Sequence, residues 1–185
     1  MKEVEVKAHL RDREKIVANL EKLGCTFGEK VKQIDTVYAK ILGNVDEYLK
    51  NDHFVRIREK NDGRFIFTVK QPKDARKNLI KTEHETEVKN PKELENMLFL
   101  MGYKVANKVI KIRQVAKFKN YEICLDDVKD LGNFIEIEKM YEDGTESDEE
   151  ALGELKAFIG SLGVLDSDEV KKGYDIMMIE HLEKK

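Results

Sequence analysis

The stretch Glu3-Val4-Glu5-Val6-Lys7, close to the amino terminus, decides the fold. Side chains alternate between the two faces of a β-strand, so Glu3, Glu5 and Lys7 share one face, while Val4 and Val6 share the other. An ordinary edge strand that exposes charges to water would show the same pattern. Here the pattern returns in later strands, with charges of both signs. We therefore expect the charged faces to converge inside a barrel.

The later strands are predicted from alternation and turn signals. The turn Asn61-Asp62-Gly63 between two β-rich runs is typical of a hairpin, which predicts strands at 54–60 and 64–71. Further strands are expected at 31–41, 81–89, 103–119, 121–127 and 133–140, and 72–79 is expected to be an exposed loop. The charged faces of the strands carry Arg56, Arg58, Lys70, Glu83, Glu85, Glu87, Lys111, Arg113, Glu122, Asp126, Glu136 and Glu138.

Four segments space their apolar residues as helices do: 11–23, 90–102, 147–162 and 167–182. Amphipathic helices need an apolar surface to cover, and the Val, Ile, Phe and Leu faces of the strands supply one. The consistent arrangement places the helices outside a curved antiparallel sheet and the charged faces inside it. A flat sheet with one solvated face would also satisfy the pattern.

Composition narrows the class of protein. With 185 residues, 41% of them apolar and 38% charged, the chain fits one globular domain over 1–185. Its net charge of −3 gives no reason to expect nucleic acid as a partner. Cys25 and Cys124 are far apart, which excludes a cysteine zinc site and indicates a reduced setting. Because no signal peptide or membrane-length apolar run is present, we expect a cytoplasmic protein.

The mixture of charges favours a site for a metal-bound polyphosphate. A triphosphate carries about four negative charges near neutral pH and needs several cationic partners to leave bulk water. Arginines contact phosphate bidentately, and lysines act as point charges. Carboxylates alone would repel such a ligand, so their presence beside the cations suggests Mg²⁺ or Mn²⁺ between protein and phosphate. Glu3 and Glu5 could hold one metal with a cross-strand partner, or contribute to a pair of metals.

These residues resemble the motifs of the CYTH superfamily, also called triphosphate tunnel metalloenzymes. The amino-terminal Glu-x-Glu-x-Lys is matched by Glu3, Glu5 and Lys7. The second-strand motif is similar to Gln33-x-Asp35-Thr36-x-Tyr38, with one extra residue before the tyrosine. The remaining motifs resemble Arg56-x-Arg58, Thr68-x-Lys70, and the stretch from Leu125-Asp126-Asp127-Val128 to Glu138. Five motifs in family order span almost the whole chain.

The resemblance implies an α+β fold: an eight-stranded antiparallel β-barrel that forms a triphosphate tunnel, with helices packed on the outside. It also implies dependence on a divalent metal, which Glu3, Glu5, Glu136 and Glu138 would bind. Phosphates would be held by Lys7, Arg56, Arg58, Lys70, Lys111 and Arg113, with a looser match at the last two. The residues expected to be catalytic are Glu5, Lys7, Lys70 and Tyr38.

Within the superfamily the chain is most similar to the small group that includes class IV adenylyl cyclases. That implies attack of the ribose 3′-hydroxyl of ATP on the α-phosphorus, giving cyclic AMP and pyrophosphate. The alternative is a triphosphatase, in which water attacks the terminal phosphorus of thiamine triphosphate or inorganic triphosphate. A non-catalytic triphosphate- or RNA-binding module is disfavoured, because only Tyr38 and Phe134 lie among the cationic positions as aromatics. We expect a small-molecule triphosphate as partner, no nucleic acid or membrane, and a monomer or homodimer.

Overall fold

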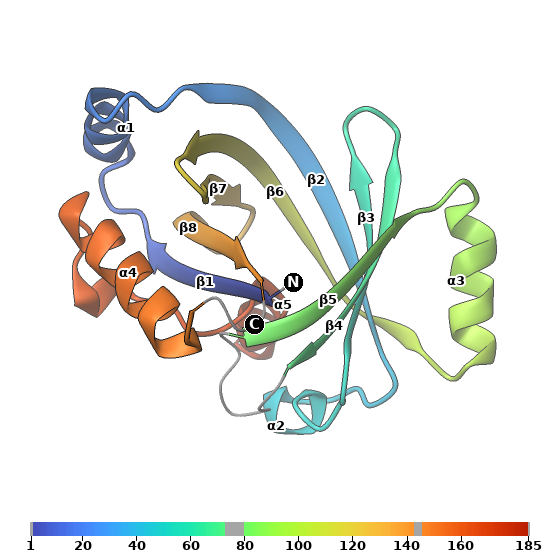
Figure 1. Cartoon of the computed structure of the whole chain (residues 1–185). Coiled ribbons are helices and arrows are strands. Elements are labelled where there is room, and N and C mark those ends of the chain that lie inside the picture. The colour runs from blue at the N-terminus through green and yellow to red at the C-terminus, as the bar shows by residue number, and fades with distance from the viewer. Residues whose placement is uncertain (1, 73–79, 143–145, 185) are drawn as a thin grey trace.

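The computed structural model describes residues 2–72, 80–142 and 146–184. Eight antiparallel strands curl into a barrel in the order β1-β5-β4-β3-β2-β6-β7-β8 (Figure 1). The strands are β1 Lys2–His9, β2 Phe27–Ala39, β3 Phe54–Lys60, β4 Phe65–Pro72, β5 Ile80–Glu87, β6 Lys104–Phe118, β7 Tyr121–Val128 and β8 Gly132–Tyr141. The expected barrel is confirmed. The loop expected at 72–79 lies almost entirely outside the described residues.

The helices are α1 Arg13–Lys22, α2 Val45–Tyr48, α3 Pro91–Leu100, α4 Asp148–Ser161 and α5 Tyr174–Glu183, with a 3₁₀ turn, η1, at Asp166–Asp168. Helices α1 and α4 lie on the outside of the barrel near β1, and α3 stands outside β3 and β4 (Figure 1). The fold is therefore mixed α+β, as expected. No helix in the described ranges is long and apolar enough to cross a membrane.

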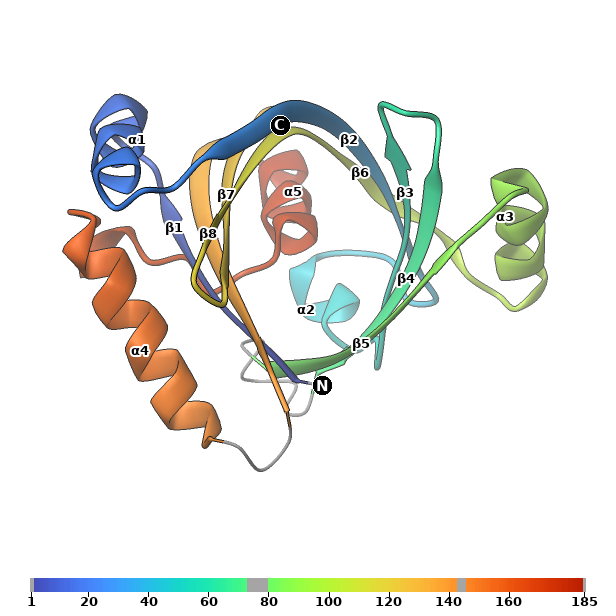
Figure 2. The ribbon, with the colours of Figure 1, turned by 45° about the horizontal axis from the view of Figure 1, so that its top comes forward.

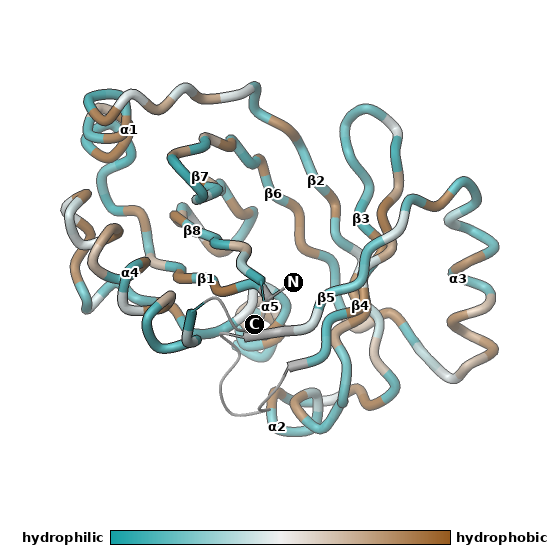
Figure 3. The backbone as a smooth tube through the Cα atoms, in the orientation of Figure 1, coloured by the Kyte–Doolittle hydropathy of each residue, from teal (hydrophilic) through white to brown (hydrophobic). Residues whose placement is uncertain are grey.

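The two faces of β1 separate as its sequence predicts. Val4 and Val6 are buried in the main core, where they pack with Leu155 and Ile159 of α4. Burial of such aliphatic side chains contributes about 1.5–3 kcal/mol each. Hydrophilic and hydrophobic positions alternate along this strand and its neighbours (Figure 3). The charged residues of β1 consequently face the barrel interior.

The β3–β4 hairpin follows the same rule. Its outward residues Val55, Ile57 and Phe67 pack against Leu98 of α3. This leaves the alternate positions of both strands, which carry the expected cations, on the inner face. The turn between the strands contains Gly63 with a φ of +81°, a backbone conformation that glycine adopts without steric cost.

The barrel closes unevenly around β1. This strand pairs with β8 over eight residue pairs, whereas its pairing with β5 comprises, among the described residues, Glu3↔Lys81 and Val4↔Ile80. Further along β1, Glu169 forms a β-bridge with Ala8, and the Val170 N–H donates to the Lys7 carbonyl at 2.7 Å. The segment before α5 therefore pairs with the later part of β1.

This pairing explains why the helix expected at 167–182 is wrong in its first part. The chain forms η1, then an extended stretch, and helix α5 begins only at Tyr174. Arg11 fixes η1 by donating from Nε to the Asp168 carboxylate at 2.7 Å. Helix α5 then packs its apolar residues against inward-facing strand residues such as Val37 and Val128, so with α2 it covers one end of the barrel (Figure 2).

Candidate active site

The barrel encloses a cavity of about 680 Å³, within the size range of small-molecule sites. Every strand contributes inward-facing side chains to it. The charged residues lining it are Glu3, Glu5, Lys7, Asp35, Arg56, Arg58, Lys60, Lys70, Glu83, Glu85, Lys111, Arg113, Glu122, Glu136, Glu138 and, from α5, Asp175. All six predicted phosphate-binding residues are therefore brought together, including the two with the looser motif match.

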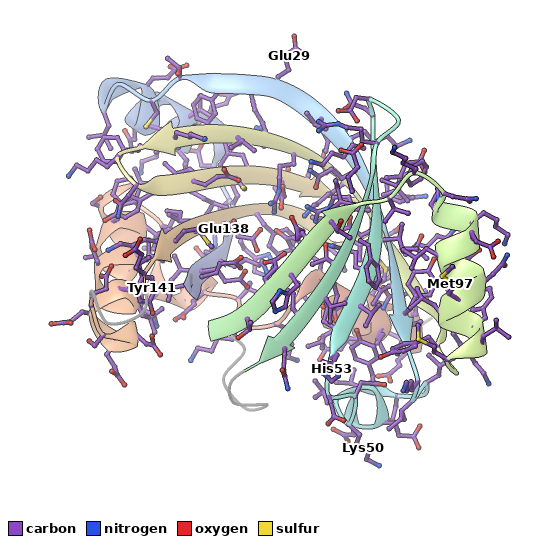
Figure 4. All side chains as sticks on the ribbon, turned by 45° about the vertical axis from the view of Figure 1, so that its right-hand side comes forward. Glu29, Lys50, His53, Met97, Glu138 and Tyr141 are labelled. Carbon is purple, nitrogen blue, oxygen red and sulfur yellow. The ribbon has the colours of Figure 1, made fainter. Side chains whose placement is uncertain are left out.

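Three of the four predicted metal ligands form one cluster. Glu5, Glu136 and Glu138 each bring a carboxylate oxygen within 4.8 Å of the others. The geometry follows from strand pairing, because Glu5 lies directly opposite Glu138 across the β1–β8 ladder and Glu136 is two positions along on the same face. Glu138 points into the barrel interior, whereas Tyr141 of the same strand lies toward α4 (Figure 4).

The surroundings of Glu136 and Glu138 shift the pKa values of these two carboxylates in opposite directions. Burial and the neighbouring Glu136 raise the pKa of Glu138 to about 7. Burial alone would also raise the pKa of Glu136, but Lys7 and Arg113 outweigh it and hold that pKa well below its usual range. Lys7 Nζ lies 3.0 Å from the Glu136 carboxylate, and Arg113 donates to the same carboxylate. Crowded carboxylates whose pKa values diverge are typical of functional sites.

This donor set fits a small divalent cation. Mg²⁺ and Mn²⁺ prefer oxygen ligands and are commonly held by a few carboxylates plus substrate phosphates. Glu5, Glu136 and Glu138 offer such oxygens next to the cationic wall of the cavity. Their number and spacing suit one ion that also contacts the ligand.

Glu3 lies apart from this cluster. Its carboxylate is 3.4 Å from Lys70 Nζ, and the same ammonium group is 2.5 Å from Glu83 of β5. Burial, reinforced by Glu83 alongside, raises the pKa of Glu3 to about 8. Glu3 therefore lies with Lys70 and Glu83, apart from the three clustered carboxylates, and its predicted role as a metal ligand stays a prediction.

Two arginines of β3 share one acidic partner that was not among the predicted site residues. Asp35 of β2 accepts from Arg58 Nε at 2.7 Å and Arg58 Nη2 at 2.8 Å, and from Arg56 Nη1 at 3.4 Å. Arg56 also donates to Thr68 and to Glu85. Asp35 stands in the second-strand motif, and that motif was the signal that could have identified it.

A second acidic residue anchors the cations of β6. Asp126, fully buried on β7, accepts from Arg113 Nε at 2.7 Å and Nη2 at 2.6 Å, and lies 3.7 Å from Lys111 Nζ. Burial and the Arg113 charge lower the pKa of Lys111 to about 8. Asp126 was expected on a charged face, but its pairing partners depend on how the strands are arranged.

Tyr38 is the one predicted catalytic residue that the structure does not place in the cavity. Along β2, Gln33, Asp35 and Val37 line the cavity, so Tyr38 points to the outer wall. There its hydroxyl donates to Glu95 of α3 at 3.0 Å. The extra residue before this tyrosine, relative to the family motif, changes the face on which it lies.

Tyr174 is a cavity residue that the sequence did not indicate. It is the first residue of α5, and its hydroxyl donates to Asp126 Oδ2 at 3.0 Å. Its ring lies against Lys7 and Lys111. From the sequence, Tyr174 was expected only on the apolar face of the last helix. The neighbouring residues give no signal that the start of this helix lines the cavity.

Comparison with known proteins gives consistent results. The CYTH domain family matches residues 1–174. A Methanocaldococcus jannaschii protein, provisionally named an adenylate cyclase, is 31% identical over 174 residues, which cover 94% of this chain and 97% of the relative.

Two solved structures show the same fold. A Pyrococcus horikoshii protein aligns over 99% of both chains with 28% identity and a TM-score of 0.80. A Hippeastrum protein, provisionally named an adenylyl cyclase and described as having a dominant triphosphatase activity, aligns over 94% of this chain and 91% of its own. Its identity is 17% and its TM-score 0.59, so this similarity concerns the fold alone.

Proposed function

Because this chain belongs to the CYTH domain family, we propose that it is a metal-dependent enzyme that converts ATP to cyclic AMP and pyrophosphate. One observation carries the proposal: the cluster of Glu5, Glu136 and Glu138 lies in the same cavity as the six predicted phosphate-binding cations. A cavity that carried only cations would suit a free anion, and one that carried only acids would suit a metal. The combination suits a metal-bound triphosphate.

The six cations are Lys7, Arg56, Arg58, Lys70, Lys111 and Arg113. In the free site each of them already has an acidic partner. A bound triphosphate would exchange contacts with these carboxylates for contacts with phosphate oxygens. In a cavity shielded from bulk water such contacts stabilise developing negative charge strongly. Neutralising the leaving pyrophosphate is the role we assign to these side chains.

Glu5, Glu136 and Glu138 would hold the divalent ion. When bound, the ion supplies charge neutralisation and lowers the pKa of the attacking hydroxyl. In the cyclase reaction the ribose 3′-oxygen forms a bond to the α-phosphorus, and the bond from that phosphorus to the pyrophosphate oxygen breaks. The hydroxyl proton passes to a carboxylate of the site. Atoms and charge balance without any further reactant.

Triphosphatase activity is the second candidate, with thiamine triphosphate or inorganic triphosphate as substrate. It is favoured by the many charged side chains in the cavity lining, because these suit a phosphate chain and require no base or sugar in the substrate. The Hippeastrum protein of the same fold, with its dominant triphosphatase activity, supports keeping this candidate. In that reaction water, instead of a ribose hydroxyl, attacks the terminal phosphorus.

A product assay tests both candidates. Purified protein is incubated with ATP, thiamine triphosphate or inorganic triphosphate, with Mg²⁺ or Mn²⁺, and the products are separated. A Glu136→Gln variant prepared in the same way controls for contaminating activity. Cyclic AMP with pyrophosphate supports the cyclase, whereas orthophosphate with the matching diphosphate or pyrophosphate supports the triphosphatase. Absence of turnover for all three substrates contradicts both.

A further inference from the structure

Tyr174 contacts two cations of the cavity with its ring. Lys7 Nζ lies 4.4 Å from the ring centroid, and Lys111 Nζ lies 5.1 Å from it. Both distances fall within the roughly 6 Å over which an ammonium group is attracted to an aromatic face. Only 8% of Tyr174 is exposed, so water weakens these contacts little.

The ring itself is held by the barrel wall. The hydroxyl of Tyr174 donates to Asp126 of β7 at 3.0 Å, and its ring packs edge-on against Phe134 of β8, with centroids 5.1 Å apart. A side chain fixed at both its tip and its face has little rotational freedom left. It can therefore act as a rigid surface for the ammonium groups beside it.

The chain that leads to Tyr174 is tied to the same strand as Lys7. The Val170 N–H donates to the Lys7 carbonyl at 2.7 Å, and Glu169 forms a β-bridge with the adjacent Ala8. Lys7 is therefore contacted twice from the carboxyl-terminal part of the chain, at its main chain and at its side chain. The last residue of the amino-terminal Glu-x-Glu-x-Lys motif depends on a segment more than 160 positions away.

We propose that Tyr174 is a positioning residue that holds the ammonium groups of Lys7 and Lys111 in place for triphosphate binding. The inference rests on the proposed function and adds to it a role for the carboxyl-terminal segment. Both lysines have acidic neighbours, Glu136 at 3.0 Å and Asp126 at 3.7 Å, that compete with the ligand for them. The ring attracts each ammonium group without neutralising it, so the positive charge stays available to a phosphate.

A purely structural role for Tyr174 would give a different outcome. In that case the residue packs α5 onto the barrel, and its replacement lowers stability without a specific effect on ligand affinity. Comparison of two variants separates the roles: Tyr174→Phe keeps the aromatic face and loses the hydroxyl, whereas Tyr174→Leu loses both. Ligand affinity and thermal stability are then measured on the same preparations.

The experiment is calorimetric titration of the full chain with inorganic triphosphate, with and without Mg²⁺. We expect Tyr174→Leu to weaken binding by about fivefold to thirtyfold, the range that corresponds to losing two cation–π contacts. Tyr174→Phe should stay within about threefold of the unaltered protein, because the ring remains. In turnover assays the Leu variant should raise KM more than it lowers kcat.

Tyr121 provides a matched control. It is as buried as Tyr174, and its hydroxyl also donates to a carboxylate, that of Glu154, but it lies on the outer face of β7. Tyr121→Leu should lower the melting temperature and leave triphosphate affinity unchanged. A double-mutant cycle adds a second check: in a Lys7→Met, Lys111→Met background, Tyr174→Leu should have little further effect on binding.

Three results would overturn the inference. Equal loss of affinity in the Phe and Leu variants would assign the effect to the hydroxyl and Asp126 instead of the ring. Unchanged affinity in Tyr174→Leu would show that the lysines need no support from it. An undiminished effect in the double-lysine background would show that it does not act through them. If the unaltered protein bound no triphosphate, the proposed function itself would fail, and this inference with it.

Discussion

Both carboxylate oxygens of Asp35 accept hydrogen bonds from the guanidinium group of Arg58, at 2.7 Å and 2.8 Å. This bidentate pair lies in the cavity wall, and Arg56 joins it at 3.4 Å. Burial alone would raise the pKa of Asp35, but Arg56 and Arg58 hold it well below its usual range. The two arginines are therefore oriented in the free protein, and under the proposed function a phosphate would meet them already in place.

Asp35→Asn should consequently lower the stability of the ligand-free protein. It should also enlarge the stabilisation that bound triphosphate gives. Removing the charge leaves the buried Arg56 and the largely buried Arg58 without this counterion, and breaking a buried ion pair typically costs about 3–5 kcal/mol. A bound triphosphate replaces the missing negative charge. Melting curves with and without inorganic triphosphate test this, and the ligand-induced rise in melting temperature should be larger in the variant than in the unaltered protein.

The exposed ion pair of Asp62 and Arg64 in the β3–β4 turn provides a control, because it also joins a carboxylate to a guanidinium group. Arg64 Nε and Nη2 lie 2.8 Å and 2.7 Å from a single carboxylate oxygen, Asp62 Oδ2, and the pair is exposed to water. Asp62→Asn should therefore change neither the melting temperature nor its response to triphosphate. An Asp35→Asn variant that behaved in the same way would show that the buried pair has no special role in orienting the arginines.

Triphosphate affinity should fall as the pH rises above about 8, because Lys111 then loses its charge. Burial and the neighbouring Arg113 lower the pKa of Lys111 to about 8 in the folded protein. The protonated form attracts phosphate, so affinity is retained below this pKa and lost above it. We expect the dissociation constant to rise by up to about tenfold per pH unit above pH 8. Calorimetric titrations across that range measure the slope.

Lys111→Arg isolates this contribution, since an arginine stays charged throughout the range. The variant should show a flatter dependence of the dissociation constant on pH above 8, whatever its absolute affinity. If the slope is unchanged, another group is responsible for it. Glu3, whose pKa is raised to about 8, would then be the next residue to replace.

Glu5→Gln should abolish metal-dependent turnover while leaving the fold intact. The substitution keeps the size of the side chain but removes one of three carboxylates in the cluster. We expect turnover to fall by about 100-fold or more, together with weaker Mn²⁺ binding measured by calorimetry. Glu87→Gln, at the exposed end of β5, should change neither. Full activity of Glu5→Gln at saturating Mg²⁺ would contradict the assigned metal cluster.

Much of this site could be predicted because strand alternation is a local property. The faces of β1, β3, β6 and β8 follow from residues two positions apart, and each predicted cation points inward for that reason. In contrast, the order and pairing of the strands determine which carboxylates lie next to each other. Glu3 joins Lys70 and Glu83 because β1 pairs with the first described residues of β5, where Glu3 lies opposite Lys81. The sequence contains no local signal for that closure.

The carboxyl-terminal segment shows the same limit. The spacing of apolar residues predicted one helix over 167–182, yet Glu169 forms a β-bridge with Ala8 and the Val170 N–H donates to the Lys7 carbonyl. Backbone pairing with a distant strand overrides local helix propensity. Tyr174 reaches the cavity only as a result of that pairing.

Tyr38 provides a direct test of prediction against structure. The motif marked it as catalytic, but its hydroxyl donates to Glu95 of α3 at 3.0 Å on the outer wall. Tyr38→Phe should therefore keep turnover within about twofold of the unaltered protein and lower stability by only about 0.5–1.5 kcal/mol, the value of one hydrogen bond. Steady-state kinetics and denaturant unfolding measure both. A loss of kcat by tenfold or more, with stability preserved, would restore Tyr38 to the catalytic residues and require that β2 turn this side chain inward when the ligand binds.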